Sequence, residues 1–457
     1  VSEWLQPVKH KKRKLFTRFL PNIVSIIWGL SRIFATFEQP NNRNHLAMKE
    51  NDPIPTLAPT WGADVFPLLS WFKQERLKRA NVMVVGCGAL GNEVLKNLAL
   101  FGVGHLVVVD FDTIEPSNLT RSILFSQADA EARRPKATVT AKRIREINPS
   151  IQVLPLECDI CHDIGLGLLR QMDVVVGCVD NRWARYCLNR LCMRVGVPWV
   201  DGGIDGLEGT ARVFMPGKNC YACNLGPEAL KDMSYRLSCS ASIQRNEQAN
   251  RVPTTPVIAS IIGAVEAQEA IKLLHPDELA SGELTSLCGK MFYYEGQHLA
   301  ARIAGFTGYD EECPVHEQWE PIEKADLTTD SPIGEALDNL AGQLGCNDVE
   351  IILRDHCFVD YLTIRKDDRE VTVMLPDYAI AQFLEEEPTL RHLPFHAFYQ
   401  HEIKAIDSHF PYRDLTLSQI GIPPWSILHV RTENGNRYVE LADERNYSTF
   451  LFQSRQV

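Results

Sequence analysis

Short apolar runs alternate with amphipathic segments between residues 74 and 274. Four runs, at residues 82–85, 106–109, 151–155 and 174–176, have the length and composition of strands buried on both faces. A fifth, less apolar segment at 199–203 completes the predicted strands. Segments with apolar residues three or four positions apart predict helices around residues 71–77, 94–101, 137–147, 165–171 and 183–195. Strands that alternate with helices form a doubly wound, mostly parallel sheet that binds ligands at the carboxyl ends of its strands. The pattern therefore predicts an α/β domain of this kind.

The pattern changes toward the end of the chain. A polar segment at 231–256 precedes a long apolar helix, predicted at 257–274. From about residue 345 short β-rich runs follow, at 349–353, 371–375 and 427–430, which indicates a separate α+β domain. We therefore expect three parts, namely a basic N-terminal extension and linker at 1–60, the α/β domain at 61–322 and a smaller α+β domain at 323–457.

Charge and cysteine content narrow the function classes. The 457-residue chain carries a formal net charge of −11, which argues against a general nucleic-acid binder. Its 13 cysteines occur without a convincing secretory signal, and this favours the reducing cytoplasm, where thiols bind metals or take part in catalysis. Residues 1–50 differ, with nine Lys or Arg against three Glu, and predict a disordered or loosely docked extension. A basic helix lying on a membrane surface is the alternative for this segment.

A glycine-rich loop follows the first strand. Gly86, Gly88 and Gly91 form a G-x-G-x-x-G pattern at the strand-to-helix turn, where glycines let the backbone approach a phosphate at the helix N-terminus. Asp110 ends the second strand, 19 residues after Gly91, at the place where an acid binds a ribose hydroxyl. The glycine pattern alone is weak, but both strands, the helix and the acid in register predict a nucleotide site.

Further polar residues follow other predicted strands and helices. They are Asp112, Asn118 and Arg121 after the second strand, Lys136 at the start of a helix, and Asp180, Asn181 and Arg185 after the fourth strand. Carboxylates, amides and cations at strand ends suit a ribose, a polyphosphate and Mg²⁺, for which Asp180 offers a hard oxygen ligand. A solvated polar loop and a helix N-cap at Asp180 or Asn181 are the simpler structural readings.

This ordered array resembles the ThiF/MoeB superfamily, which includes the adenylating domains of ubiquitin-activating enzymes. The resemblance covers about residues 70–320 and implies a Rossmann-like fold that uses ATP and Mg²⁺. It implies that the C-terminal glycine of a β-grasp protein attacks the α-phosphate of ATP, so that pyrophosphate leaves and an acyl adenylate remains. The roles it implies are ribose binding by Asp110, phosphate binding by Asn118, Arg121 and Lys136, and Mg²⁺ binding by Asp180.

A cysteine pair indicates a metal site. Cys220 and Cys223 have the two-residue gap that lets both thiolates bind one Zn²⁺. The family usually closes this site with a second C-x-x-C, whereas this chain has Cys313 and His316 in a C-x-x-H. We expect a structural Cys₃His zinc site, and the alternative is two reduced, buried cysteines with an unrelated surface C-x-x-H.

Cys239 is the candidate nucleophile. In the superfamily a cysteine of the segment before the long helix attacks the adenylate or forms an adduct with the carrier. Cys239 is the only cysteine between Cys223 and that helix, and Arg236 and Arg245 would favour its reactive thiolate. A spectator cysteine is the alternative.

Two features bear on the partners. Family members carry an arginine in an arm before the first strand, where this chain has Asp64-Val65-Phe66 and only Arg76 or Arg79 to replace it. A homodimer is still expected, although this departure weakens the inference. Residues 415–430 resemble the closing part of a ubiquitin-like domain, which implies a conjugating enzyme as a further partner; an unrelated α+β appendage is the alternative.

The leading hypothesis is an activating enzyme for a ubiquitin-like protein, which adenylates the carrier, forms a thioester on Cys239 and transfers it to a conjugating partner. The runner-up is a sulfur-carrier adenylyltransferase of the molybdopterin or thiamine type. From other classes, an NAD-dependent oxidoreductase does not account for Arg121, Lys136 and Asp180 in one crevice. A nucleotide-binding scaffold is disfavoured because the expected ATP-site residues, apart from the arm arginine, are present.

Overall fold

The computed structural model describes residues 69–226, 228–229, 254–306, 308–364, 368–386 and 398–443. The predicted N-terminal extension, the linker, the arm positions 64–66 and Cys239 lie outside these residues. Among the described helices, none has both the length and the apolar composition needed to cross a membrane.

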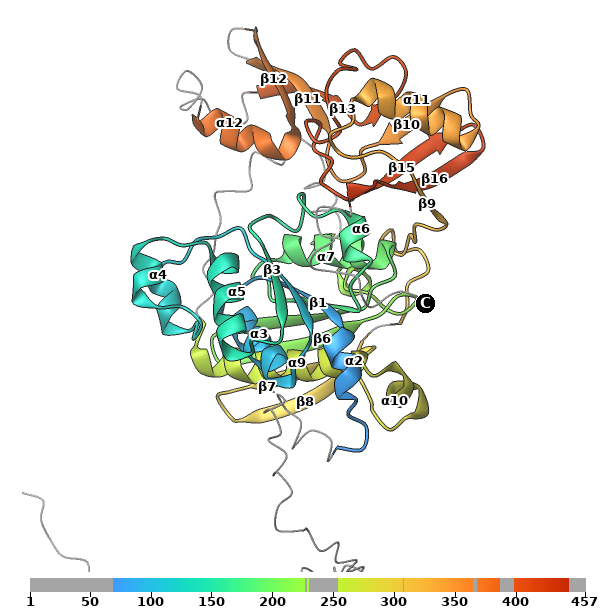
Figure 1. The fold of residues 1–457 in the computed structure, drawn as a ribbon. Coiled ribbons are helices and arrows are strands. Elements are labelled where there is room, and N and C mark those ends of the chain that lie inside the picture. Colours follow the sequence, from blue (N-terminus) through green and yellow to red (C-terminus); the bar gives the residue numbers. More distant parts are fainter. Residues whose placement is uncertain are drawn as a thin grey trace, which may run out of the picture. The chain divides into compact units, whose positions relative to one another are not determined.

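A sheet of eight strands forms the larger domain (Figure 1). Five parallel strands come first along its order, and they are β3 (Gln152–Leu156), β2 (His105–Val109), β1 (Asn81–Val85), β4 (Val174–Gly177) and β5 (Trp199–Asp205). Each matches a predicted strand to within two residues, which confirms the mostly parallel α/β fold. The sheet continues through antiparallel strands β6 (Glu208–Phe214), β7 (Lys290–Glu295) and β8 (Ala300–Gly305), which the hydrophobic pattern did not predict.

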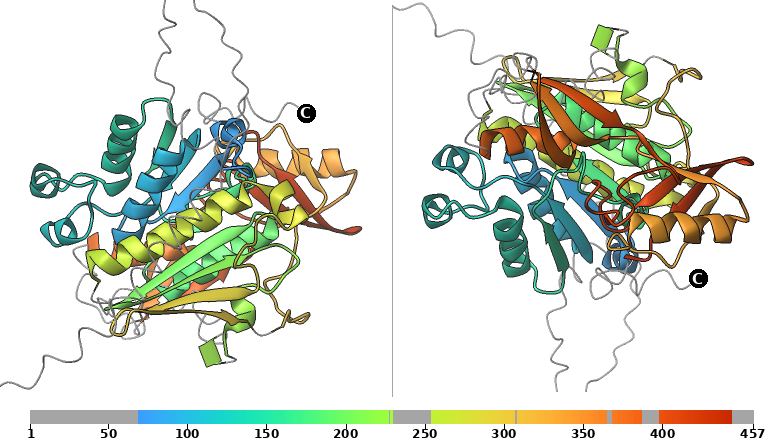
Figure 2. Two further views of the ribbon diagram at one scale, coloured as in Figure 1. Left: turned by 90° about the horizontal axis from the view of Figure 1, so that it is seen from below. Right: turned by 90° about the horizontal axis from the view of Figure 1, so that it is seen from above.

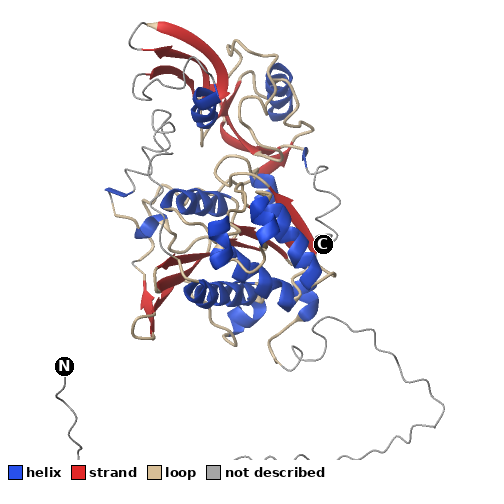
Figure 3. Ribbon diagram, turned by 90° about the vertical axis from the view of Figure 1, so that its left-hand side faces the viewer, coloured by secondary structure: helices blue, strands red, loops and turns tan. Residues whose placement is uncertain are grey.

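Helices cover both faces of this sheet (Figures 2 and 3). One face packs against α3 (Ala89–Phe101), α5 (Lys136–Ile147) and α9 (Pro256–Leu273). The other packs against α6 (Leu166–Leu169) and α7 (Arg182–Arg194). Alternate residues of β1 serve the two faces, since Val82 and Val84 belong to the first core and Met83 and Val85 to the second. Shorter helices α2 (Gln74–Arg79), α4 (Gln127–Glu131) and α10 (Pro276–Ser281) complete the domain.

The smaller domain is built on a second, five-stranded mixed sheet. Its order is β14 (Ala405–Ile406), β10 (Val349–Ile352), β15 (Ile427–Thr432), β16 (Gly435–Glu440) and β9 (Ile322–Lys324). Helix α11 (Ile333–Leu344) packs on the sheet through Leu337 and Leu340, which share a core with Ile351 and Val430. This confirms the α+β class that the short β-rich runs predicted.

A long excursion of the chain leaves and re-enters this sheet at neighbouring positions. Ile352, the last residue of β10, pairs with Ala405, the first residue of β14. Between them lie β11 (Phe358–Ile364), β12 (Arg369–Pro376), α12 (Ile380–Glu386) and β13 (Phe398–Ile403), whose strands form a separate sheet in the order β12-β11-β13. Val359, Leu362 and Val373 form part of a small core of its own.

Trp425 packs against α6, which belongs to the larger domain. Its carbonyl oxygen accepts a hydrogen bond from the Gly167 N–H at 2.8 Å. A Cβ atom at Gly165 or Gly167 would lie within 2.5 Å of Trp425 atoms, so this close approach requires glycine at both positions. The Trp425 indole N–H donates to buried Glu440 at 2.8 Å, and Arg170 also pairs with that carboxylate at 2.8 Å.

A second set of contacts at this junction is ionic. Asp355 of the excursion pairs with Arg190 at 3.0 Å and with Arg194 at 2.6 Å, both on α7. The two arginine side chains are only 7% and 5% exposed, and that of Asp355 is 23% exposed. The arginines hold the pKa of Asp355 well below its usual range although burial opposes this, so the carboxylate stays ionised at neutral pH.

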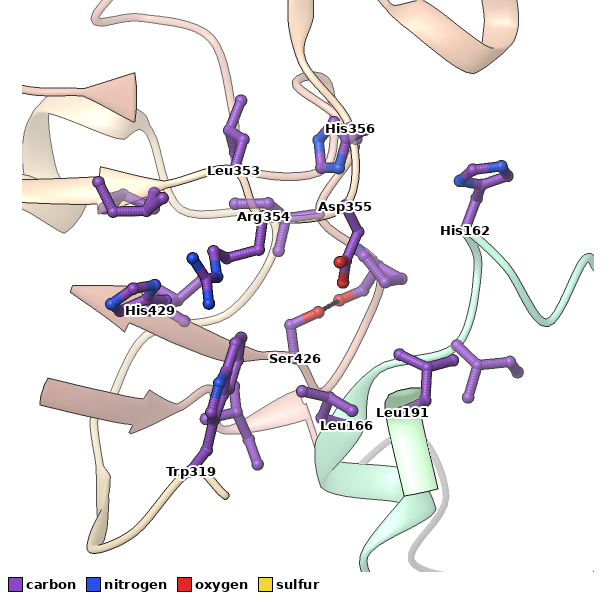
Figure 4. A pocket seen from close by; sticks show the side chains of 18 of the residues that line it. His162, Leu166, Leu191, Trp319, Leu353, Arg354, Asp355, His356, Ser426 and His429 are labelled. Carbon is purple, nitrogen blue, oxygen red and sulfur yellow. Dashed lines mark hydrogen bonds between the residues drawn. The ribbon is translucent and has the colours of Figure 1, made fainter. Parts of the chain in front are cut away.

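A cavity of about 80 Å³ lies beside Asp355 at the same junction (Figure 4). His162 and Leu191 line it from the larger domain, while Arg354 and His429 line it from the smaller one. None of its lining residues belongs to the nucleotide or metal sites that the sequence predicts.

Candidate nucleotide site and metal centre

The glycine loop joins β1 to α3, and steric contacts explain two of its glycines. Gly86 has φ +94°, and a Cβ there would lie 2.5 Å from the Cys178 carbonyl oxygen. A Cβ at Gly91 would lie 1.9 Å from the Gly86 carbonyl oxygen. A Cβ at Gly88, the N-cap of α3, would meet no protein atom within 4 Å. The open space at this helix N-terminus is where a phosphate group would fit.

Asp110, Asp112 and Lys136 lie together beside this loop. The Asp110 carboxylate accepts hydrogen bonds from the Cys87 N–H at 2.6 Å and from the Asp112 N–H at 2.8 Å. The Lys136 Nζ donates to Asp112 at 2.7 Å. Burial raises the pKa of Asp110, although the Lys136 ammonium opposes the change. Burial alone would lower the pKa of Lys136, but Asp110 and Asp112 outweigh it and the pKa is raised, so the lysine remains a cation.

Asn118 and Arg121 lie in the short 3-10 turn Pro116–Thr120 and just after it. The Asn118 side-chain oxygen accepts a hydrogen bond from the Glu115 N–H at 2.9 Å, which caps the turn. The Arg121 guanidinium donates to the Ser117 carbonyl at 2.8 Å, within its own turn. Both residues therefore have local structural contacts, and their phosphate-binding roles stay predictions.

Asp180 and Asn181 lie in the short segment between β4 and α7, on the side of the glycine loop, because β4 pairs with β1. The Asn181 side-chain oxygen accepts a hydrogen bond from the Ala184 N–H at 2.8 Å, so Asn181, and not Asp180, is the N-cap of α7. Its amide also donates to Asp180 at 3.2 Å. Asp180 is exposed at the carboxyl end of the sheet, and its oxygens fit the preference of Mg²⁺ for hard ligands.

Arg185 points into the protein. Its Nε donates to Asp201 at 2.8 Å, and its Nη2 donates to the carbonyl oxygens of Val179 at 2.7 Å and Gly202 at 2.8 Å. Three of the five guanidinium N–H donors therefore have protein acceptors. The sequence analysis placed this residue among the nucleotide ligands, and that role stays a prediction.

A buried polar network behind Arg185 was not expected from the sequence. Fully buried Asp201 also pairs with Arg212, and Glu266 of α9 lies close by with its carboxyl 3.9 Å from the Cys178 thiol. Burial raises the pKa of Glu266 well above its ordinary value and Asp201 raises it further, although Arg185 opposes the change, and the shift favours the neutral form. The only sequence signal was the presence of acidic residues, Glu266 and Glu269, on the mostly apolar helix predicted at 257–274.

Four metal-ligating side chains converge as the cysteine spacing predicted. The Cys220 Sγ lies 3.6 Å from the Cys223 Sγ and 3.8 Å from the Cys313 Sγ, and the His316 Nε2 lies 3.2 Å from the Cys223 Sγ. All four ligand atoms lie within 4.8 Å of one another. A tetrahedral zinc site with Zn–S bonds of about 2.3 Å has S–S edges of about 3.8 Å, so the donor set fits Zn²⁺.

Metal removal should destabilise this domain. A strong chelator is expected to release about one zinc per chain and to lower the melting temperature, because a structural site contributes its binding free energy to folding. Cys313→Ser should lose the metal, while Cys288→Ser, at a half-buried cysteine outside the cluster, should keep it. Elemental analysis of protein purified without chelator provides the measurement, and a metal-free wild type would contradict the four-ligand site.

The two candidate replacements for the arm arginine both lie on α2. Arg76 pairs with Asp277 at 2.5 Å and with Glu278 at 3.0 Å, which ties α2 to α10. Arg79 is exposed in the last turn of α2. The candidate positions 64–66 and the nucleophile Cys239 lie outside the described residues.

Comparison with known proteins identifies the family. A model described as the ThiF family matches residues 60–315. The SAMP-activating enzyme E1 of Haloferax volcanii is 34% identical over 246 residues, which are 53% of this chain and 82% of that protein. The sulfur carrier protein ThiS adenylyltransferase of Escherichia coli is 33% identical over 244 residues, 53% of this chain and 88% of the relative.

Two further proteins are similar to this chain over a smaller share of their own length. The chain spans 47% of the adenylyltransferase and sulfurtransferase MOCS3-1 of Zea mays, with 31% identity over 52% of its own length. The solved structure of E. coli MccB with ATP aligns with a TM-score of 0.42 and 24% identity, over 53% of this chain and 68% of that one. The family match covers more than half of the chain and includes every residue of the nucleotide site described above. The chain therefore belongs to the ThiF family, and it is an ATP-dependent adenylyltransferase.

Proposed function

We propose that the protein adenylates the C-terminal glycine of a ubiquitin-like β-grasp protein. The carboxylate of that glycine attacks the α-phosphorus of ATP. The bond from the α-phosphorus to the β-phosphate breaks, pyrophosphate departs, and an acyl adenylate remains. One observation carries this proposal: the glycine loop, the Asp110–Asp112–Lys136 group and Asp180 all occupy the carboxyl ends of β1, β2 and β4, which are adjacent in the sheet. The names of the relatives that act on SAMP or ThiS support the same class of substrate.

Each side chain has a task in this reaction. Asp110 is held by two backbone N–H groups, so its carboxylate is oriented for a ribose hydroxyl. The Lys136 ammonium is buried and charged, and it would stabilise negative charge on the phosphates. Asp180 would hold Mg²⁺, which supplies positive charge to the polyphosphate when bound. The four-ligand cluster would hold a structural Zn²⁺.

We further propose that the activated carrier moves to Cys239. The thiolate would attack the acyl carbon, AMP would leave, and a thioester would remain. The smaller domain supports a conjugation pathway, because a five-stranded mixed sheet packed on the single helix α11 has the elements of a ubiquitin-like domain that could receive a conjugating enzyme. A sulfur-carrier adenylyltransferase is the second candidate, and the name of the E. coli relative favours it. Membership of the ThiF family favours adenylyl transfer over the alternative of an NAD-dependent oxidoreductase.

The first test is exchange of labelled pyrophosphate into ATP. Exchange should require a β-grasp protein with a C-terminal glycine, and a truncated carrier that lacks this glycine should give none. Exchange that proceeds without any carrier, or that no such carrier supports, would contradict adenylation of this substrate class.

Cys239→Ala separates the two candidate functions. The variant should keep carrier-dependent exchange, because adenylation precedes thiol attack, and it should lose a carrier adduct that survives denaturing gels and disappears on thiol reduction. Cys288→Ala, at a cysteine on the loop before β7, should retain the adduct. An adduct that persists in Cys239→Ala would assign the chemistry to another cysteine. Brisk exchange without any adduct in the wild type would favour the sulfur-carrier function.

A further inference from the structure

The segment between β4 and α7 is held by a side chain of α7. Arg185 lies on α7, one turn beyond Asp180, and its guanidinium reaches back to the Val179 carbonyl at 2.7 Å. Val179 immediately precedes Asp180, and the Asn181 amide contacts the Asp180 carboxylate from the other side at 3.2 Å. The Asp180 side chain is exposed, but the peptide group that precedes it accepts a hydrogen bond from Arg185, whose side chain is only 12% exposed.

The same guanidinium also fixes the neighbouring strand. Its Nη2 donates to the Gly202 carbonyl at 2.8 Å, and its Nε donates to Asp201 at 2.8 Å, so Arg185 joins the segment after β4 to the middle of β5. Asp201 is fully buried and pairs on its other oxygen with Arg212, which restricts its rotamer. The Asp201 carboxylate therefore orients Arg185, and a change of its rotamer would break its ion pairs with both Arg185 and Arg212.

Two adjacent glycines make this arrangement possible. A Cβ at Gly202 would lie within 2.4 Å of the Glu266 carboxyl atoms, and a Cβ at Gly203 would lie 3.0 Å from the Thr210 Oγ1 and 3.7 Å from the Arg185 Nη2. Strand β5 thus presents bare backbone where Arg185 and Glu266 approach it. The site is built for a close contact between protein groups, with three of the five donors of Arg185 used.

We infer that Arg185 is a positioning residue for the proposed metal ligand Asp180 and does not bind the nucleotide. The inference rests on the proposed function, in which Asp180 holds Mg²⁺. Partners of metal ligands orient them, and their removal typically lowers metal affinity by about 10- to 100-fold. Arg185 is expected to act on metal-dependent nucleotide binding through the Val179 carbonyl, while ATP itself keeps its contacts with the glycine loop, Asp110 and Lys136.

The test compares Arg185→Gln with Arg212→Gln by calorimetric titration of ATP, once in EDTA and once with Mg²⁺, without any carrier protein. Arg212 is the matched control, because it pairs with the same Asp201 but its described contacts include no backbone of the segment between β4 and α7. Arg185→Gln should bind metal-free ATP as the wild type does, and the Mg²⁺ concentration that gives half of the Mg²⁺-dependent tightening should rise about tenfold. Arg212→Gln should raise that concentration much less, because Arg185 keeps its own bonds to Asp201, Val179 and Gly202 in this variant.

Two results would overturn the inference. If Arg185→Gln weakens ATP binding equally with and without Mg²⁺, Arg185 is a nucleotide ligand. If both variants shift the Mg²⁺ dependence alike, the network is a general structural support. Arg185→Lys, which keeps one cation with fewer donors, should show an intermediate shift and serves if the glutamine variant does not fold. Because this binding assay needs no β-grasp protein, its outcome is independent of whether carrier-dependent exchange is found.

Discussion

Asp180→Ala is expected to reduce carrier-dependent ATP–pyrophosphate exchange by about 10³-fold. The substitution removes the carboxylate that would bind the metal, and with it the charge that stabilises the phosphates during transfer. Asp180 is exposed and is not the N-cap of α7, so the fold should be unaffected. Steady-state exchange at saturating ATP, together with a melting curve, measures both effects.

A matched control is available at the next strand. Asp205 is an exposed carboxylate at the end of β5, and Asp205→Ala changes the net charge equally without touching the glycine loop or β4. It should leave exchange close to the wild-type rate. Normal exchange by Asp180→Ala would remove this residue from the metal site, and an equal loss in both variants would indicate a general electrostatic effect.

Asp355→Ala is expected to destabilise the protein by about 3 kcal/mol, because it leaves two buried arginines without their counter-charge. Arg190 and Arg194 are at most 7% exposed, and the loss of a single carboxylate puts two like charges beside each other in a medium of low polarity. Urea unfolding measures the change in free energy. Asp338→Ala, which removes an exposed partner of Arg413, should cost less than about 1 kcal/mol.

The ion pairs of Asp355 with Arg190 and Arg194 also predict how stability depends on pH. The folded-state pKa of Asp355 is depressed, so its contribution is present above the unfolded pKa of about 4 and is lost as the pH falls below that value. Wild type should therefore lose stability toward acid more steeply than Asp355→Ala. Equal acid sensitivity of the two proteins would contradict a strong ion pair at this junction.

The parallel half of the large sheet could be predicted because each of its strands is a local pattern. Residues 82–85 and 106–109 are continuous apolar runs, and buried parallel strands require such runs. Strand β8 could not be predicted from its own residues, because Ala300–Gly305 has one β-branched residue, Ile303, and its register depends on β7. Strand β7 does carry a local signal, the aromatic run Phe292-Tyr293-Tyr294, which the search for apolar runs did not use.

In the candidate nucleotide site, too, local sequence patterns could be predicted and contacts between distant residues could not. Asp110 and Asp180 could be predicted to lie at one edge of the sheet, because Asp110 directly follows β2, Asp180 lies shortly after β4, and the carboxyl ends of parallel strands share one edge. The partners of Arg185 could not, since its orientation depends on Asp201 and Gly202, which come from a different strand. The convergence of Cys220 and Cys313 across 93 residues was predictable only because thiolate spacing is itself a signal.

The excursion between Ile352 and Ala405 has a consequence for how the chain tolerates changes in length. Its ends are paired neighbours in the five-stranded sheet, so the excursion is closed by the sheet itself, and halving it would change the closure entropy by only about 0.6 kcal/mol. Chain closure therefore sets little limit on the length of the excursion, but packing does, because Phe358 of β11 is fully buried in the core that the sheet shares with α11. Shortening is expected to be tolerated only where Phe358 is kept, and a chain that also loses Asp355 would keep the Trp425 contacts while its ionic anchor to α7 is removed.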